Sequence, residues 1–429
     1  MPIFERPVIE LRRKNAAEAL GNSGPVVLIA AGEPLPKPGG LDQTYPFLPL
    51  PEYYWLSGSR RSGGVLAYEP GQGWTHFVRQ ADAAELLWEG VPEVPEGEDV
   101  AGLGDWLKSR SGKPVVRLGG PAAGQAAAPV NDPALAAAVR EKLDRVRRIK
   151  DSAEIALVET TAAATAAGFR RAREVIRPGV TERQVQVELE AEMRRHGADG
   201  TSFGTIVGAG THSAVLHFEP GARIVGEKDL VLVDSGAEVH EYSADVTRTF
   251  PASSSFTPEQ QAVYDLVLAA QAAAIAQCRP GTEWHSVHRA AAAVMAEGLK
   301  HLGLLKGSTD SLLDTGAIAL FFPHGVGHML GLRVRDVGGT LPGRPEGRLC
   351  CGARVRVDMP LEAGFLMTVE PGLYFVPAML DDAGRRAQFK DAVAWEALER
   401  WLPVGGVRIE DDILITARGP KNLTEAIPK

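Results

Sequence analysis

Two aspartates separated by a short polar segment are the first residues whose spacing indicates chemistry. Asp234 follows the apolar run 230–233, and Asp245 precedes the strand-like run 246–250. A hairpin turn centred on residues 239 and 240 would place the two aspartates directly opposite each other. Like charges opposed at about 4.5–5.5 Å destabilise a strand pair, which favours a divalent cation between them. The alternative is that both carboxylates hydrogen-bond their own backbone beside the turn.

Three later stretches add polar side chains in strand-like or glycine-rich settings. His324 and His328 lie four residues apart, but the proline and glycines around them argue against a helix. Glu370 ends an apolar strand just before Pro-Gly, where a solvated strand end is the plainer alternative. Arg408 and Glu410 share one face of a strand by its period of two, and that face could equally be exposed to solvent.

Together these stretches supply four carboxylates and one imidazole, which can balance the charge of two divalent cations. Oxygen-rich ligation with one nitrogen suits manganese, with cobalt or zinc as alternatives. Two neighbouring metals can lower the pKa of a shared water and polarise a carbonyl group, so the predicted reaction class is metal-assisted hydrolysis. The candidate ligands are Asp234, Asp245, His328, Glu370 and Glu410.

The composition disfavours several other functions. The chain has 429 residues, 45% of them hydrophobic, and a formal net charge of −8 without a Lys/Arg-rich run, which argues against nucleic-acid binding. The N-terminus lacks a secretory pattern, and no apolar run approaches a membrane span. The cysteines at 278, 350 and 351 make neither a disulfide framework nor a zinc ribbon. We therefore expect a cytoplasmic protein with no membrane partner.

The length of the chain predicts two domains. Helix and strand patterns alternate in the first third, which suggests an α/β domain with helices on a mixed sheet. The predicted helices cover about 8–20 and 81–88, and the predicted strands 26–30, 53–56, 65–68, 75–78 and 115–118. The small-residue stretch 120–130 and the long helix predicted over 133–148 place the boundary near residue 145.

The second part contains two similar segments, each a helix followed by a Pro-Gly pair and another helix. A helical pattern over 152–176 closes at a Pro-Gly pair, and Thr181 opens the next helix through a capping box. A second helix closes at Cys278-Arg-Pro-Gly281, and Thr282 opens its successor. Helix start and stop signals are common, so chance is the alternative, but two such units would suit a duplicated architecture.

The polar motifs, taken jointly, resemble those of the pita-bread metallopeptidases, which include methionine aminopeptidase, aminopeptidase P and prolidase. The matching motifs are Asp234-Ser-Gly, Asp245-Val-Thr-Arg-Thr, His324-Gly-Val-Gly-His328, Val369-Glu-Pro-Gly and Arg408-Ile-Glu-Asp-Asp. Residues 53–58 and the strands after them resemble the N-terminal domain of the creatinase, aminopeptidase P and prolidase branch. The resemblance implies an α/β (α+β) protein with a creatinase-like N-terminal domain at 1–145 and a pita-bread catalytic domain at 146–429.

The resemblance also implies a role for each ligand. Asp245 and Glu410 would bridge two metals, Asp234 would chelate one of them, and His328 and Glu370 would complete the other. Glu370 would also shuttle the proton of a metal-bridging hydroxide that attacks the peptide bond. Relatives are often homodimers, so we expect one here.

Three further residues match the family's substrate-handling positions. His217 matches a mobile histidine that contacts the scissile amide, and His324 matches a histidine that lines the substrate pocket. Arg408 would orient the metal-bound carboxylates by charge-assisted hydrogen bonds.

The choice within the family rests on one arginine and two departures. Arg356 matches the prolidase arginine that binds the free carboxylate of a C-terminal proline, which predicts hydrolysis of Xaa-Pro dipeptides. One alternative is an aminopeptidase P that acts on longer peptides with proline in the second position. The other alternative is a catalytically inactive binding protein. Arg335 stands where relatives have histidine and Phe203 where many have tyrosine, so we expect altered recognition of the proline side, with Arg335 as a substrate-binding residue.

Overall fold

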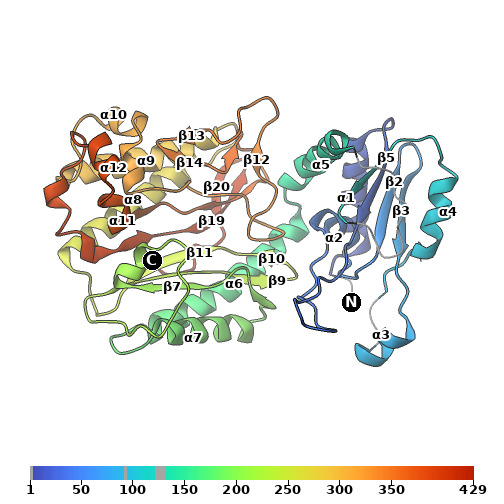
Figure 1. The fold of residues 1–429 in the computed structure, drawn as a ribbon, viewed down its shortest axis with the longest axis horizontal. Helices are drawn as coiled ribbons and strands as arrows, with labels where there is room; N and C mark the ends of the chain where they lie inside the picture. Colours follow the sequence, from blue (N-terminus) through green and yellow to red (C-terminus); the bar gives the residue numbers. More distant parts are fainter. Residues whose placement is uncertain (1–2, 91–93, 121–131) are drawn as a thin grey trace. The chain divides into compact units, whose positions relative to one another are not determined.

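The computed structural model describes residues 3–90, 94–120 and 132–429, which form two compact units (Figure 1). The first unit ends at Arg147, and the second runs from Arg148 to the C-terminus. Most of the small-residue stretch predicted near the boundary lies outside the described residues. Each unit has its own hydrophobic core.

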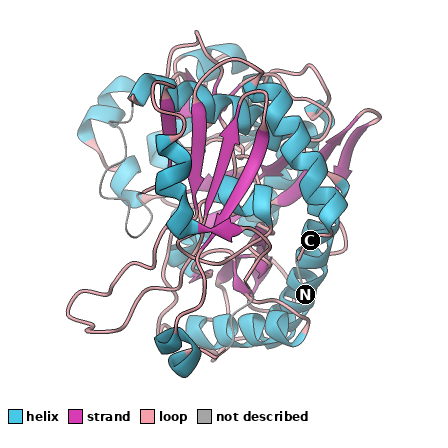
Figure 2. Ribbon diagram, turned by 90° about the vertical axis from the view of Figure 1, so that its right-hand side faces the viewer, coloured by secondary structure: helices cyan, strands magenta, loops and turns pink. Residues whose placement is uncertain are grey.

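The first unit is built on a five-stranded mixed sheet with the order β4-β3-β2-β1-β5, whose strands are seen flanked by helices in Figure 2. Strand β1 pairs antiparallel with β2 and parallel with β5, and all five of its residues are buried. The strands are β1 (Val26–Ala30), β2 (Val65–Glu69), β3 (Gly73–Val78), β4 (Glu98–Asp99) and β5 (Val115–Leu118). The helices are α1 (Arg6–Leu20), α2 (Pro51–Ser57), α3 (Ala83–Trp88), α4 (Leu103–Lys108) and α5 (Pro133–Arg148). The predicted α/β class of this unit is confirmed.

One predicted strand of the first unit is wrong. The run 53–56 forms helix α2, because Pro51 presets the helical backbone at the first turn and Gly58 ends the helix in a left-handed conformation with φ 68°. All four residues of the run are apolar or aromatic and buried, so the run shows no period that would separate a helix from a buried strand.

The second unit contains two helix pairs, and each pair packs on its own set of strands. Helices α6 (Ser152–Val175) and α7 (Glu182–Arg195) share a core with strands β7 (Ile206–Ala209), β8 (Leu230–Ser235) and β11 (Val246–Pro251). Thr181 forms the predicted capping box at the start of α7. Strand β8 lies between β7 and β11 and is antiparallel to both.

The second helix pair repeats this arrangement on the other side of the strands (Figure 1). Helices α8 (Pro258–Gln277) and α9 (Trp284–His301) share a core with β16 (Leu366–Val369), β17 (Gly372–Tyr374), β18 (Gly406–Arg408) and β19 (Asp411–Thr416). Helix α9 begins one residue later than predicted, with Glu283 rather than Thr282 as its N-cap. The two helix–Pro-Gly–helix segments predicted from the sequence therefore correspond to two helix pairs, with the strands between them.

Shorter elements complete the second unit. Two further helices are α10 (Thr309–Asp314) and α12 (Ala383–Gln388), and α11 (Pro377–Leu380) is a single turn. The remaining strands are β6 (Gly200–Thr201), β9 (Ala237–Val239), β10 (Tyr242–Ser243), β12 (Gly339–Thr340), β13 (Leu349–Cys350), β14 (Ala353–Arg354), β15 (Val357–Asp358) and β20 (Gly419–Asn422).

The hairpin that carries the two aspartates has a different register from the one predicted. Asp234 pairs with Thr247, and the turn centres on His240 and Glu241, whose φ angles are 50° and 69°. A two-residue hairpin turn of this kind needs positive φ at both central residues, and β-branched Val239 resists that conformation. Asp234 and Asp245 are consequently diagonal neighbours on one face of the ladder rather than directly opposed.

Candidate active site

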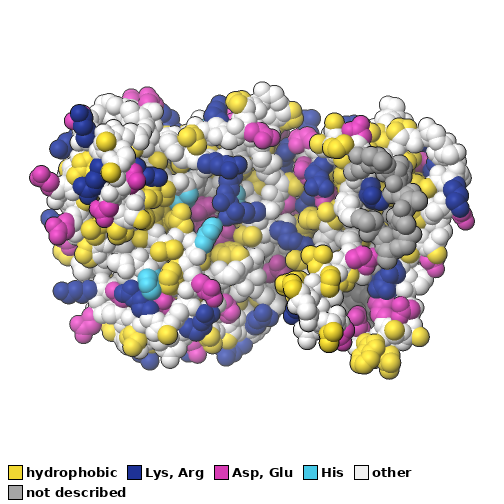
Figure 3. All heavy atoms as spheres, in the orientation of Figure 1, with side chains coloured by type: hydrophobic (Ala, Val, Ile, Leu, Met, Phe, Trp, Pro, Cys, Tyr) yellow, Lys and Arg dark blue, Asp and Glu magenta, His cyan; other side chains and the backbone are white. Residues whose placement is uncertain are grey.

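A cavity of about 770 Å³ in the second unit brings the predicted site residues together. In Figure 3, histidine, acidic and basic side chains gather around a hollow on the face of this unit. Its lining includes all the predicted site residues, namely Asp234, Asp245, His328, Glu370, Glu410, His217, His324, Arg335, Arg356 and Arg408. Residues that are far apart in the sequence thus share one space.

The five candidate ligands lie at strand ends and in breaks between strands. Asp234 lies near the end of β8 and Asp245 directly precedes β11, both on the side of the first helix pair. His328 lies in an irregular segment, Glu370 follows β16, and Glu410 occupies the break between β18 and β19. The two halves of the unit therefore each contribute side chains to the cavity.

Three of these candidate ligands lie close enough together to bind one cation. One donor atom from each of Asp245, His328 and Glu410 lies within 4.8 Å of the other two. Nε2 of His328 is 3.4 Å from Oδ2 of Asp245 and 4.0 Å from Oε1 of Glu370. The nitrogen and oxygen atoms are farther apart than in most hydrogen bonds, and at these distances they could bind one shared cation.

The histidine among them is oriented by the backbone. Nδ1 of His328 lies 3.0 Å from the carbonyl oxygen of Met329, which accepts its proton and leaves Nε2 with a free lone pair toward the carboxylates. Burial is the largest cause that lowers the pKa of His328, so the ring is neutral near pH 7. A neutral imidazole whose other nitrogen donates to a carbonyl is the usual form of a metal ligand.

The carboxylates carry the electrostatic signature of a site built for cations. Burial, followed by the charge of Asp234, raises the pKa of Asp245 well above its ordinary value. Burial and the charge of Asp245 do the same to the pKa of Glu410, and burial raises the pKa of Glu370 to about 7. Oδ1 of Asp234 is buried without a hydrogen-bond partner among the described residues. Divalent cations would remove this repulsion, so the donor set fits the metals that the resemblance implies.

A chain of hydrogen bonds connects these carboxylates to the second histidine. Arg408 donates to Oδ2 of Asp234 through Nη2 and to the hydroxyl of Tyr374 through Nη1, at 2.9 Å in the latter case. The Tyr374 hydroxyl lies 2.9 Å from Nε2 of His324, and Nδ1 of His324 lies 2.8 Å from the carbonyl of Gly325. Burial is the main cause that lowers the pKa of His324 to about 3, so its neutral ring accepts the tyrosine proton. The expected contact between Arg408 and a candidate ligand is present in the structure.

Two residues that hydrogen-bond the candidate site residues were not predicted from the sequence. Thr247 donates its hydroxyl to Oε2 of Glu410 at 2.6 Å and accepts from Nε of Arg408 at 3.0 Å. Tyr374 connects Arg408 to His324, as described above. Thr247 lies two residues after Asp245 and so shares its strand face, which is a signal that the sequence offered. Tyr374 had no such signal, because its partners are distant in the chain.

The remaining predicted residues surround the cavity more loosely. His217 follows the 3₁₀ turn η2 (Gly210–Ala214) and has an exposed side chain. Arg335 and Arg356 are also exposed, and Phe203 contributes a half-buried ring to the lining. These residues line the part of the cavity that remains open to a ligand.

Comparison with known proteins identifies the family. Residues 156–417 match the metallopeptidase family M24, and residues 9–99 match the aminopeptidase P N-terminal domain. The chain belongs to metallopeptidase family M24. The predicted pita-bread fold and the preceding smaller domain are thereby confirmed, and so is the expectation of a metallopeptidase.

Two similar proteins are named for the same activity. A probable Xaa-Pro aminopeptidase PEPP of Fusarium vanettenii is 31% identical over 415 residues, which cover 90% of this chain and 86% of the relative. A probable Xaa-Pro aminopeptidase PEPP of Coccidioides posadasii is 29% identical and covers 97% and 93% of the two chains.

Solved structures of the family agree over the full length. Aminopeptidase PepP of Pseudomonas aeruginosa has a TM-score of 0.79 at 29% identity and covers 100% of this chain and 97% of its own. Escherichia coli aminopeptidase P with the inhibitor Pro-Leu has a TM-score of 0.78 at 28% identity, with 99% and 96% covered. The comparisons therefore favour the aminopeptidase alternative over the dipeptidase that Arg356 suggested.

Proposed function

We propose that this M24 protein is a metal-dependent Xaa-Pro aminopeptidase that removes the N-terminal residue from peptides with proline in second position. The observation that carries the proposal is the acidic cavity with its five candidate ligands, in a chain similar over its length to aminopeptidase P. The alternative of a catalytically inactive binding protein loses support, because all five candidate ligands line one cavity.

The candidate ligands fit two divalent cations. Asp234, Asp245, His328, Glu370 and Glu410 would hold them. Manganese suits the four carboxylates, with cobalt and zinc as alternatives, and a zinc-substituted Escherichia coli aminopeptidase P has a similar structure. When bound, such ions lower the pKa of a water molecule and polarise the scissile carbonyl group.

The side chains of the chain itself would handle protons and position the substrate. Glu370 lines the cavity, where its carboxylate would accept a proton from the attacking water and release it later in the reaction. The exposed imidazole of His217 is free to contact the scissile amide from the cavity wall. His324 is held with its ring nitrogens on Tyr374 and Gly325, so it would shape the pocket rather than exchange protons.

The substrate side of the cavity carries two arginines. Arg335 and Arg356 are exposed on the cavity lining, and their guanidinium groups can bind peptide carbonyls or a carboxylate. Phe203 offers no hydroxyl group, so recognition of the proline side would depend on these charges and on apolar contact.

The decisive test compares a Xaa-Pro dipeptide with a Xaa-Pro-Xaa tripeptide in the presence of Mn²⁺. An aminopeptidase gives a higher kcat/KM for the tripeptide, because the longer chain adds contacts beyond the proline. A clear preference for the dipeptide would restore the prolidase interpretation. No hydrolysis of either peptide by the metal-loaded protein would refute both.

A matched pair of variants tests the role of Arg356. Arg356→Ala is expected to raise KM for substrates whose carboxylate reaches this guanidinium group, because a charge-assisted hydrogen bond contributes about 1.5–3 kcal/mol. Arg354→Ala is the control, since Arg354 is exposed two residues earlier in β14 and is not among the cavity residues that the structure describes. Equal effects of both substitutions would show that charge in general, rather than contact, is responsible.

The cellular location and the oligomeric state remain predictions. Among the described helices, none has the length and apolar character needed to cross a membrane. The cytoplasmic location and the homodimer expected from the resemblance are open to fractionation and sedimentation measurements.

A further inference from the structure

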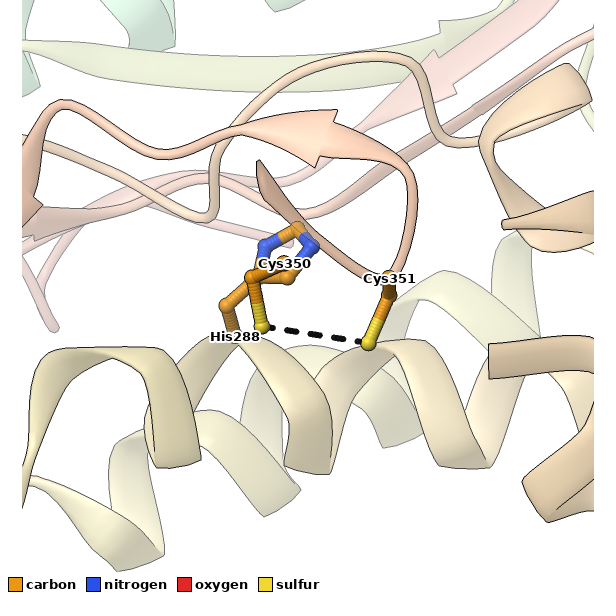
Figure 4. Close-up of side chains that lie close together, drawn as sticks. All are labelled: His288, Cys350 and Cys351. Carbon is orange, nitrogen blue, oxygen red and sulfur yellow. Dashed lines mark hydrogen bonds between the residues drawn. The ribbon is translucent and has the colours of Figure 1, made fainter. Parts of the chain in front are cut away.

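A second cluster of metal-binding side chains lies outside the candidate active site. His288 belongs to helix α9, Cys350 ends strand β13, and Cys351 follows in the turn to β14. Figure 4 shows both sulfur atoms pointing toward helix α9, beside the imidazole ring that rises from it. One ring nitrogen and the two sulfurs all lie within 4.8 Å of one another.

The sulfur spacing suits a metal ion better than a disulfide bond. The two Sγ atoms are 3.9 Å apart, and all three cysteines of the chain are free. Two thiolates bound at about 2.3 Å to one tetrahedral Zn²⁺ would be separated by about 3.8 Å. A disulfide would need about 2.05 Å, and adjacent residues have Cα atoms about 3.8 Å apart, below the usual disulfide range. A metal ion could bind with little movement of either sulfur.

The histidine is buried in a form that can bind a metal. His288 is 1% exposed, and its Nδ1 has no hydrogen-bond partner among the described residues. Burial is the main cause that lowers the pKa of the ring to about 4, so the imidazole is neutral near pH 7. Its ring stacks on Phe322 with centroids 4.9 Å apart, which fixes its orientation. An unpaired polar atom in such a position is costly unless a ligand binds it.

The thiol of Cys351 lies in a setting that favours a thiolate. A hydrogen bond from Cys350 is the largest cause that lowers the pKa of Cys351, and the same contact raises the pKa of Cys350. The charge of the neighbouring Arg289 lowers the pKa of both thiols. Cys350 is only partly buried, so solvent can reach the cluster. Two thiolates would neutralise the charge of one Zn²⁺, and a water molecule could complete the coordination.

We propose that His288, Cys350 and Cys351 form a third metal site, which binds a thiophilic divalent cation of the Zn²⁺ type. Two sulfurs and one imidazole nitrogen are a donor set for zinc, in contrast to the carboxylate-rich cavity that suits manganese. The proposal is independent of the peptidase activity.

Cobalt provides the test, because only thiolate ligands give Co²⁺ an intense charge-transfer absorption in the near ultraviolet. The reduced, metal-free full-length protein is titrated with Co²⁺ and then with Zn²⁺. We expect the band to appear and then to be displaced by Zn²⁺. Since the active-site cavity contributes only oxygen and nitrogen donors, Co²⁺ bound there does not produce this band. Its absence from the wild-type protein would overturn the proposal.

Variants test which cysteines produce the absorption band, because the chain has only three cysteines. The double substitution Cys350→Ser with Cys351→Ser is expected to abolish the band. His288→Gln is expected to move the titration midpoint to higher Co²⁺ concentration. Cys278→Ser is the control, because Cys278 is fully buried and donates its thiol to the carbonyl of Ala274. A band that survives the double substitution, or that disappears in the control, would overturn the proposal.

A measurement on the wild-type protein keeps the test independent of variant folding. Trypsin releases residues 349–354 as one peptide that contains both adjacent cysteines. Zn²⁺ is expected to slow alkylation of this peptide in the native protein, measured by mass spectrometry, and a chelator is expected to restore the rate. An alkylation rate that does not change with Zn²⁺ would refute the site.

Discussion

Thr247 is the residue whose removal most directly tests the support of the candidate metal ligands. Its hydroxyl donates to Oε2 of Glu410 at 2.6 Å and accepts from Nε of Arg408 at 3.0 Å, and the side chain is fully buried. Thr247→Val keeps the shape of the side chain and removes both hydrogen bonds. The variant therefore isolates the hydroxyl group from the packing around it.

The magnitude follows from the charges on both partners. A hydrogen bond to a charged group contributes about 1.5–3 kcal/mol, and about 1.4 kcal/mol corresponds to a factor of ten in affinity. With the carboxylate of Glu410 no longer oriented, we expect Mn²⁺ to bind about 10–100-fold more weakly. Calorimetric titration of the metal-free protein measures this directly, and the Mn²⁺ dependence of peptide hydrolysis gives a second value.

Two matched variants make the result decisive. Thr247→Ser restores the hydroxyl and should return metal affinity close to that of the wild type. Thr249→Val removes a buried hydroxyl from the same strand that bonds only the backbone of Arg408, at 3.0 and 3.2 Å. An affinity of Thr247→Val within about twofold of the wild type, or an equal loss in Thr249→Val, would refute the reasoning.

Three further outcomes are expected. Tyr374→Phe should lower kcat about tenfold with metal affinity nearly unchanged, because it frees His324 but leaves the ligands in place; an unchanged kcat would contradict the role. Glu370, like Asp245 and Glu410 beside it, binds its proton more tightly when folded, so the metal-free protein should lose stability as the pH rises from 4.5 to about 7, and melting curves without and with Mn²⁺ should diverge across that window. Lys150→Met should lower the free energy of unfolding in urea, because it removes the ion pair between Nζ and the almost fully buried carboxylate of Asp336, 2.6 Å away; an unchanged free energy would contradict this role.

The sequence alone determined the family and most of the elements. Strand β1 and helix α5 have the predicted bounds, because a buried apolar run and a long helical segment are local signals. The candidate ligands could be identified because the order of their motifs is specific, even though no single carboxylate was decisive. The same local signals were insufficient for the run 53–56, where Pro51 and the C-terminal glycine determined a helix.

Only the tertiary structure decided how distant residues meet. The hairpin register depended on which residues tolerate positive φ, so Asp234 pairs with Thr247 instead of Asp245. The supporting role of Tyr374 and the approach of His288 to two cysteines were invisible in the chain, because side chains separated by tens of residues leave no periodic signal. Motifs record which donors the protein has. Packing of the two helix pairs around the strands determines which donors line the same cavity, because the contacts between them are made across the fold.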